Sequence, residues 1–300
     1  MEDGLAGEPR AFWSTLVAMV RNVNGEPKSI AISLGILLAL YIWFRMMNRH
    51  GIIVVVRRFI DPSALSSVAD SFHYMTTYLI FFLATAYIVL FRERYPSLGS
   101  RLWTDYPAYE ATTMDRFVVY LEIVHYVVST TVLVANCLVK HRVNTLMIIH
   151  HVLALTMAVL MYSTHQVRLA IAMVFLHDIT DVSLEFSKLC NHLIGPPLSL
   201  VPLLLFAIVF PVCRLVLVPA LLTVPHYKAM VSGQHSLWGG YVIQGVLMGL
   251  LTLNIIWTLS VWRLLLNTFR ACRVCAVATD PEQRKACERP DLSFVTYHSM

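Results

Sequence analysis

Two short polar clusters interrupt long apolar runs and hold the residue types that could do chemistry. His150 and His151 are adjacent in one run, and His177, Asp178 and Asp181 lie in the next. A histidine beside a carboxylate can act as a general base, because the carboxylate fixes its tautomer and stabilises the imidazolium. It can also attack a thioester and form an acyl-imidazole. Both routes are acyl transfer, so these five residues are the predicted catalytic group.

The spacing around the second cluster predicts a polar helical face. His177, Asp181, Glu185 and Lys188 follow steps of four, four and three residues, which share one side of a helix. Asp178 lies beside that stripe. Two other interpretations remain open: a network that only packs helices together, and a metal site, because His and Asp also bind zinc and iron. The sequence has no HxxxH or HExxH, so no metal is predicted.

The composition places these clusters in a membrane. Hydrophobic residues make up 57% of the 300-residue chain and charged residues 14%, against about 25% charged in soluble domains. The sequence predicts an all-α, polytopic membrane protein of about seven transmembrane helices that enclose an intramembrane cavity. The predicted spans are Ser29–Met47, Met75–Phe91, Phe117–Val139, Thr145–Tyr162, Leu169–Ser187, Leu198–Val224 and Tyr241–Leu266.

Charge predicts the orientation of the chain. The formal net charge is +5, which fits basic residues flanking hydrophobic spans, and no zinc-finger spacing or basic stripe indicates a nucleic-acid partner. Basic residues are somewhat more frequent on the side of the C-terminus. We therefore expect a cytosolic C-terminus and an N-terminus on the opposite, lumenal side.

The fifth predicted span, 169–187, is apolar only in its first half, so it must pack among other helices or line a wet cavity. A short loop, 163–168, makes it the antiparallel neighbour of the span before it. At about 1.5 Å per residue, His150 and Asp181 then lie at similar depth, and Asn254 of the last span reaches the same level.

Other polar residues within the spans have simpler interpretations. Glu122 and His125 lie three residues apart, either as an internal pair or as part of a cavity lining. Arg214, near the far end of the sixth span, is predicted to extend its guanidinium to the interface and to have no chemical role. The prolines of that span should bend it and can open space between helices.

The stretch from His150 to Lys188, HHVLALTMAVLMYSTHQVRLAIAMVFLHDITDVSLEFSK, resembles the signature of ceramide synthases in the TLC-domain family. That signature has a double histidine, an arginine, HDxxD and LExxK; the matching residues here are His150, His151, Arg168, His177, Asp178, Asp181, Leu184, Glu185 and Lys188. One departure is Thr180, where serine is usual, and another is the absence of a homeobox-like segment between the first two spans.

The resemblance implies an activity: acyl-CoA-dependent N-acylation of a sphingoid base in the endoplasmic reticulum membrane. Acyl-CoA is then a co-substrate, no further cofactor is expected, and a homodimer is an assembly that the family often forms. Arg168, Glu185, Lys188 and Asn254 are the predicted substrate-binding residues. The alternatives are a non-catalytic TLC-domain lipid sensor or cargo receptor, and a receptor or proton-coupled transporter.

Three regions are expected along the chain. Residues 1–67 form an N-terminal segment with the first transmembrane helix and a basic connector. Residues 68–268 form the catalytic membrane domain, and residues 269–300 a polar cytosolic tail.

Overall fold

The computed structural model describes residues 27–92, 102, 103, 106, 108–140, 144–194, 198–233 and 237–277, and in these ranges every regular element is helical. The α-helices are α2 (Pro27–Val56), α3 (Pro62–Ala86), α5 (Thr113–Lys140), α6 (Thr145–Ser163), α7 (Val167–Leu193), α8 (Leu200–Pro211), α9 (Val224–Val231) and α10 (Leu237–Val277). Three π-helical segments, η1 (Tyr87–Arg92), η2 (Val212–Leu217) and η3 (Pro219–Thr223), extend α3 and join α8 to α9. The predicted tail from residue 278 onward lies outside the described residues.

Among the residues that the structure describes, six segments are long and apolar enough to cross a membrane, which confirms the all-α polytopic class. They are Ile30–Val56, Pro62–Arg92, Thr113–Val139, Thr145–Ser163, Leu200–Val231 and Gly239–Arg270. The fifth predicted span forms helix α7 and has membrane-spanning length, but it is not among the six because its C-terminal half is polar.

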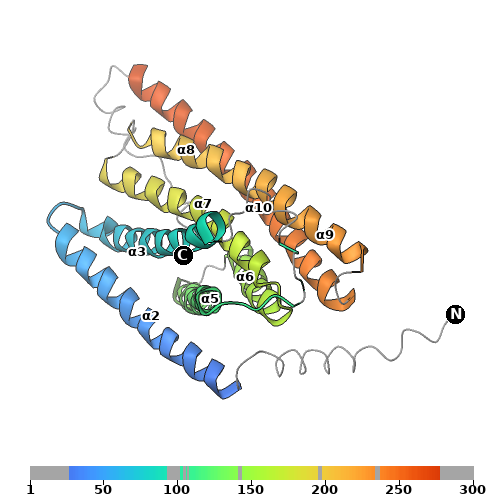
Figure 1. Ribbon diagram of the computed structural model, residues 1–300. Helices are drawn as coiled ribbons and strands as arrows, with labels where there is room; N and C mark the ends of the chain where they lie inside the picture. Colours follow the sequence, from blue (N-terminus) through green and yellow to red (C-terminus); the bar gives the residue numbers. More distant parts are fainter. Residues whose placement is uncertain are drawn as a thin grey trace.

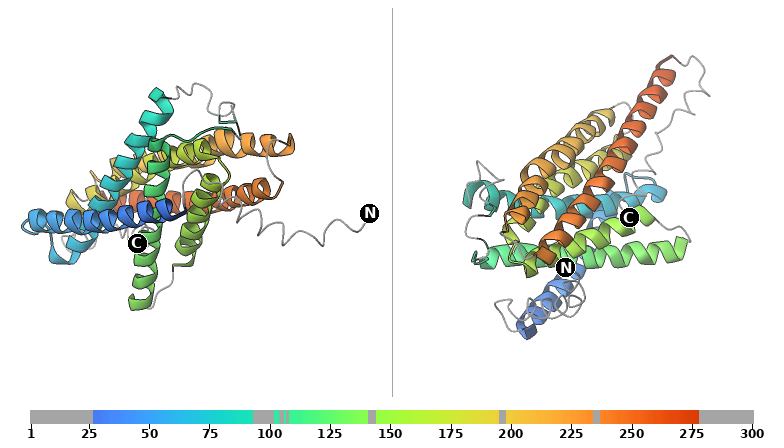
Figure 2. Two further views of the ribbon diagram at one scale, coloured as in Figure 1. Left: turned by 60° about the horizontal axis from the view of Figure 1, so that its bottom comes forward. Right: turned by 90° about the vertical axis from the view of Figure 1, so that its right-hand side faces the viewer.

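Helix α7 lies at the centre of the bundle. It packs against α3, α5, α6 and α8 and against the π-helical segments after α8 (Figure 1). These neighbours bury its polar side chains: His177, Asp178, Thr180, Glu185, Ser187 and Lys188. Charged and polar groups at membrane depth need this enclosure, because lipid offers them no hydrogen-bond partners. Helix α2, in contrast, lies at the edge of the bundle on α3 and α5 (Figures 1 and 2).

Tight local structure sets the register of α6 against α7. Asn144 caps the start of α6, where its side-chain oxygen accepts a hydrogen bond from the backbone N–H of Met147. Only Thr164–Gln166 separate the two helices, and His165 turns the chain with a φ of 60° in the left-handed region. The short link makes α6 and α7 antiparallel neighbours, as the sequence predicted.

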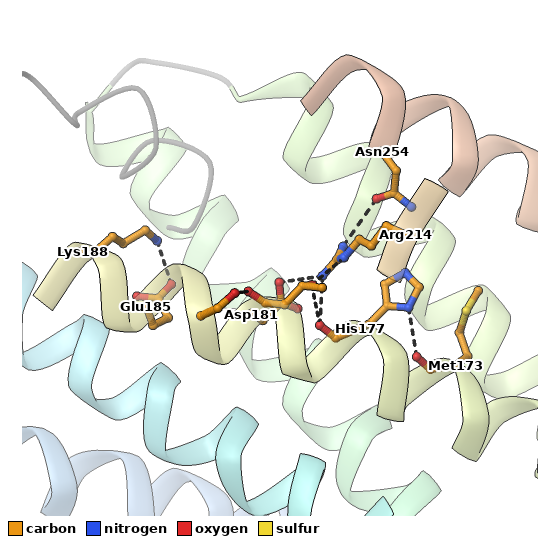
Figure 3. A network of polar contacts seen from close by, with 9 residues as sticks. Met173, His177, Asp181, Glu185, Lys188, Arg214 and Asn254 are labelled. Carbon is orange, nitrogen blue, oxygen red and sulfur yellow. Dashed lines mark hydrogen bonds and ion pairs between the residues drawn. The ribbon is translucent and has the colours of Figure 1, made fainter. Parts of the chain in front are cut away.

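The sixth predicted span does depart from regular α-helical geometry at its prolines. Helix α8 ends at Pro211, and π-helical turns follow from Val212 and from Pro219. Proline removes a backbone donor, and a π-turn rotates the side chains that follow it. This local geometry turns Arg214, which lies on η2, toward α7 (Figure 3).

Candidate active site

The imidazole of His151 is held in one orientation by helix α5. Its Nδ1 lies 3.0 Å from the Thr130 hydroxyl, and that hydroxyl donates its proton to the Tyr126 carbonyl oxygen at 2.6 Å. Because the hydroxyl proton is already used, Thr130 Oγ1 accepts and His151 Nδ1–H donates. In the neutral ring the lone pair therefore lies on Nε2, the nitrogen that remains available for proton or acyl transfer.

His150 is held by aromatic contacts. Its ring makes an edge contact with Trp257, with centroids 4.9 Å apart, and lies against Tyr126 and His151. Among the described residues no hydrogen bond reaches its Nδ1. The Nδ1 of His150 is thus uncommitted in a buried setting.

Arg214 is the centre of the polar network (Figure 3). Its Nη2 lies 2.6 Å from Asp181 Oδ1 and 3.3 Å from the His177 carbonyl oxygen, and its Nε donates to Thr180 Oγ1 at 2.7 Å. Its Nη1 makes a longer contact of 3.5 Å with Asn254 Oδ1. The guanidinium joins α7, η2 and α10, so it fixes the position of Asp181 at the site.

The predicted interfacial position of Arg214 is therefore wrong: its side chain is only 3% exposed. The prediction considered only that the arginine side chain is long enough to reach the interface. The π-turn after Pro211 instead directs the guanidinium into the bundle. The sequence did contain a clue to this burial. A cation within an apolar span requires a counter-charge at the same depth. Asp181 is that counter-charge.

A second ion pair lies one helical turn beyond Asp181. Lys188 Nζ donates to Glu185 Oε1 at 2.7 Å, and both side chains are buried (Figure 3). Glu185 also lines the main cavity. Lys188 thus balances the charge of a carboxylate that borders this cavity.

Two cavities meet at His150 and Tyr126, which line both. The main cavity contains about 910 Å³ of space between side chains, part of it open to the outside. Its lining includes Tyr74, Tyr78, His125, Ser129, His151, Asp181, Glu185, Phe210, Arg214 and Trp257. The smaller cavity extends along α5, α6 and α7 past Glu122 and His177, and its other walls are mostly apolar. His150 is thus accessible from two sides.

The structure gathers most of the predicted catalytic residues but separates some. His150, His151 and Asp181 share the main cavity, and His177 faces the smaller one. His177 Nδ1 donates to the Met173 carbonyl oxygen at 2.9 Å. Asp178 is buried, and its Oδ2 has no partner among the described residues.

Among the described residues, no hydrogen bond joins a histidine of α6 to an aspartate of α7. Thr130 holds His151 instead, and Arg214 holds Asp181. The reason is geometric: the cavity separates the two helix faces at this level, and each polar group finds a nearer partner on another helix.

Two further predictions are resolved by position. Arg168 lies in the first turn of α7, with its guanidinium carbon 4.0 Å from the centroid of the Tyr109 ring, so the structure does not bring it to the cluster. It is thirteen residues from Asp181, about 20 Å along a helix.

Glu122 and His125 line different cavities and do not pair with each other. In the part of the chain that the structure describes, no group of three or more metal-binding side chains is placed to hold a metal ion.

Membrane-length helices around a buried cavity of histidines, carboxylates and one arginine define a multi-pass membrane protein with an intramembrane polar site. Residues 67–263 match the sequence profile of the TLC domain. The chain therefore belongs to the TLC-domain family, as its signature predicted, and α2 lies outside the matched region.

Two curated human proteins are similar to this chain. Ceramide synthase 4 is 30% identical over 118 residues, which are 39% of this chain and 30% of the relative. Ceramide synthase 5 is 28% identical over 131 residues, 43% of this chain and 33% of the relative. The similarity thus spans about a third of each relative's length.

Proposed function

We propose that this protein is a ceramide synthase that transfers a fatty acyl group from acyl-CoA to the amine of a sphingoid base. The observation that carries the proposal is the main cavity itself. It brings two histidines, one with a defined free Nε2, to the same space as a carboxylate fixed by Arg214. Similarity to human ceramide synthases 4 and 5 supports the same reaction class.

The residues have distinct roles in this proposal. Asp181 and Glu185 attract the ammonium group of the base. Lys188 holds Glu185, and Arg214, which also contacts Asn254, holds Asp181. The bound ammonium group first releases one proton to water, which gives the neutral amine. As its nitrogen attacks the thioester carbonyl, a histidine Nε2 accepts the second amine proton. The C–S bond then breaks, and the CoA thiolate takes that proton from the imidazolium. The products are an amide, (dihydro)ceramide, and free CoA.

A covalent route uses the same groups in another order. A histidine attacks the thioester and releases the thiol, and the amine then displaces the imidazole from the acyl carbon. Intact-protein mass spectrometry after addition of acyl-CoA alone distinguishes the two routes. A mass gain of one acyl group identifies the covalent route; turnover without such a gain identifies the general-base route.

The proposed setting is the endoplasmic reticulum membrane, with the C-terminus in the cytosol and the N-terminus in the lumen. Acyl-CoA would then approach from the cytosol, and the sphingoid base would enter from the bilayer. A homodimer is part of the proposal by analogy with the family. The apolar walls of the cavities suit two substrates that carry alkyl chains.

The test is a direct assay of the purified protein in detergent. Sphinganine and acyl-CoAs of graded chain length are added, and the N-acyl product is detected by mass spectrometry. We expect product with at least one acyl-CoA, and His50→Ala, which changes an exposed histidine of α2, should leave turnover unchanged. A folded protein that binds sphinganine but acylates it with no donor would instead be a lipid-binding TLC-domain protein.

Removal of the Thr130 hydroxyl should impair His151. In Thr130→Val the shape is nearly kept, but Nδ1–H loses its acceptor and the ring loses its fixed tautomer. We expect kcat to fall by about tenfold, the equivalent of one lost hydrogen bond. Thr130→Ser keeps the acceptor and should retain turnover. Equal rates in the valine and serine variants would contradict this role.

A further inference from the structure

Helix α2 lies outside the matched domain, yet one of its side chains reaches the site. Tyr41 is only 4% exposed, and it packs against Val124 and Val128 of α5. Its hydroxyl lies 2.6 Å from His125 Nδ1. Most of the remaining α2 surface is exposed, so this contact is where the helix enters the interior of the bundle.

His125 faces the main cavity from within a shell of aromatic rings. The rings of Tyr41, Tyr74, Tyr78, Phe81 and Tyr126 all pack around it. At its second nitrogen, Nε2, the Ser129 hydroxyl lies 3.5 Å away. A histidine whose Nδ1 is tied by a hydrogen bond has its ring orientation and tautomer set by that partner. A side chain outside the TLC domain therefore orients a group inside it.

The two walls of the main cavity differ in chemistry. One wall, from α6, α7 and η2, carries His150, His151, Asp181, Glu185 and Arg214. The adjoining wall, from α3 and α5, carries Tyr74, Tyr78, His125, Tyr126 and Ser129. The first wall is rich in ionic groups and suits an ammonium group and a reacting thioester. The second offers hydroxyl and imidazole groups, which both donate and accept hydrogen bonds and so match an uncharged hydroxyl.

We propose that His125 and Ser129 bind a hydroxyl group of the acceptor, a hydroxylated long-chain amine, and that Tyr41 is the positioning residue for His125. The proposal rests on the proposed function, because it assigns the recognition of the acceptor to that same cavity. It makes α2 a part of the site: without the Tyr41 hydroxyl, the ring of His125 can turn away from the bound hydroxyl.

The test compares two acceptors in three variants. Sphinganine carries hydroxyl groups, and octadecylamine has a similar alkyl chain and amine without them. In Tyr41→Phe and in His125→Phe we expect kcat/KM for sphinganine to fall by about tenfold, through KM, with octadecylamine unaffected. The double variant should be no worse than His125→Phe, because the two side chains act as one unit.

Tyr87→Phe is the matched control, since it removes an exposed phenol hydroxyl far from this contact in sequence, on η1. Equal losses for both amines would show a merely structural role and overturn the proposal, as would additive losses in the double variant. A wild-type protein that makes no amide from either amine contradicts the proposed function. In that case we would measure the equilibrium affinity of each amine for the variants and the wild type. A loss of affinity for sphinganine alone would support the inference, whereas unchanged affinity for both amines would overturn it.

Discussion

Replacement of both His150 and His151 by alanine is expected to lower turnover to less than about one-thousandth of the wild-type rate, because proton transfer and nucleophilic attack are both removed. The bundle should still fold. Both side chains border an existing cavity, and the only hydrogen bond that either makes among the described residues is the one to Thr130. Mass spectrometry of the N-acyl product measures the first effect, and thermal unfolding in detergent measures the second.

The single variants refine this prediction. His151→Ala removes the imidazole whose Nε2 has a defined lone pair, and His150→Ala removes the ring that borders both cavities. If the two histidines act together, each single variant should lose nearly as much turnover as the pair. Product formation at the wild-type rate by the well-folded double variant would exclude both histidines from the chemistry.

Arg214→Met should have the largest effect on stability. Methionine has a similar length, but it leaves the Asp181 carboxylate, the Thr180 hydroxyl and the His177 carbonyl oxygen without their shared donor. Removal of one partner of a buried ion pair destabilises a protein by about 3–5 kcal/mol. Because Asp181 is partly open to the cavity, we expect the lower end, about 3 kcal/mol. Turnover should fall at least about a hundredfold because Asp181 is no longer held in place.

A compensating variant tests the cause. Asp181→Leu combined with Arg214→Met removes both charges, so it should recover most of the lost stability. It should not recover turnover, because Asp181 is also needed at the site. The measurements are the unfolding midpoint in detergent and the rate of acyl transfer. An Arg214→Met protein with wild-type stability and turnover would contradict the assigned role of this network.

The helices and much of the site could be predicted because each depends on local pattern. Of the seven predicted spans, six correspond to membrane-length apolar segments in the described part of the chain. The spacing of Asp181, Glu185 and Lys188 placed them on one side of α7. The predicted substrate-binding role of Arg168 came from a linear motif. Such a motif does not show that Arg168, at the start of α7, lies far from the polar cluster near the middle of that helix.

Contacts between helices could not be predicted from one sequence. The tautomer of His151 depends on Thr130, twenty-one residues earlier on α5, and thus on the register of two packed helices. Arg214 depends on π-turns that follow proline, which change the direction of a side chain without changing the apolar pattern. Tyr41 and His125 lie on helices whose contact no periodicity indicates.

The enclosed polar half of α7 has a consequence for how the protein is made. In the described ranges, six segments are apolar enough to partition into lipid singly, whereas α7 carries charges that oppose its release into the bilayer. Its counter-charge, Arg214, is translated later, so we expect the stable insertion of α7 to require the α8–η2 segment. We therefore expect membrane insertion to depend on cooperation between successive helices, and chains that end before η2 should insert α7 less efficiently than the full chain.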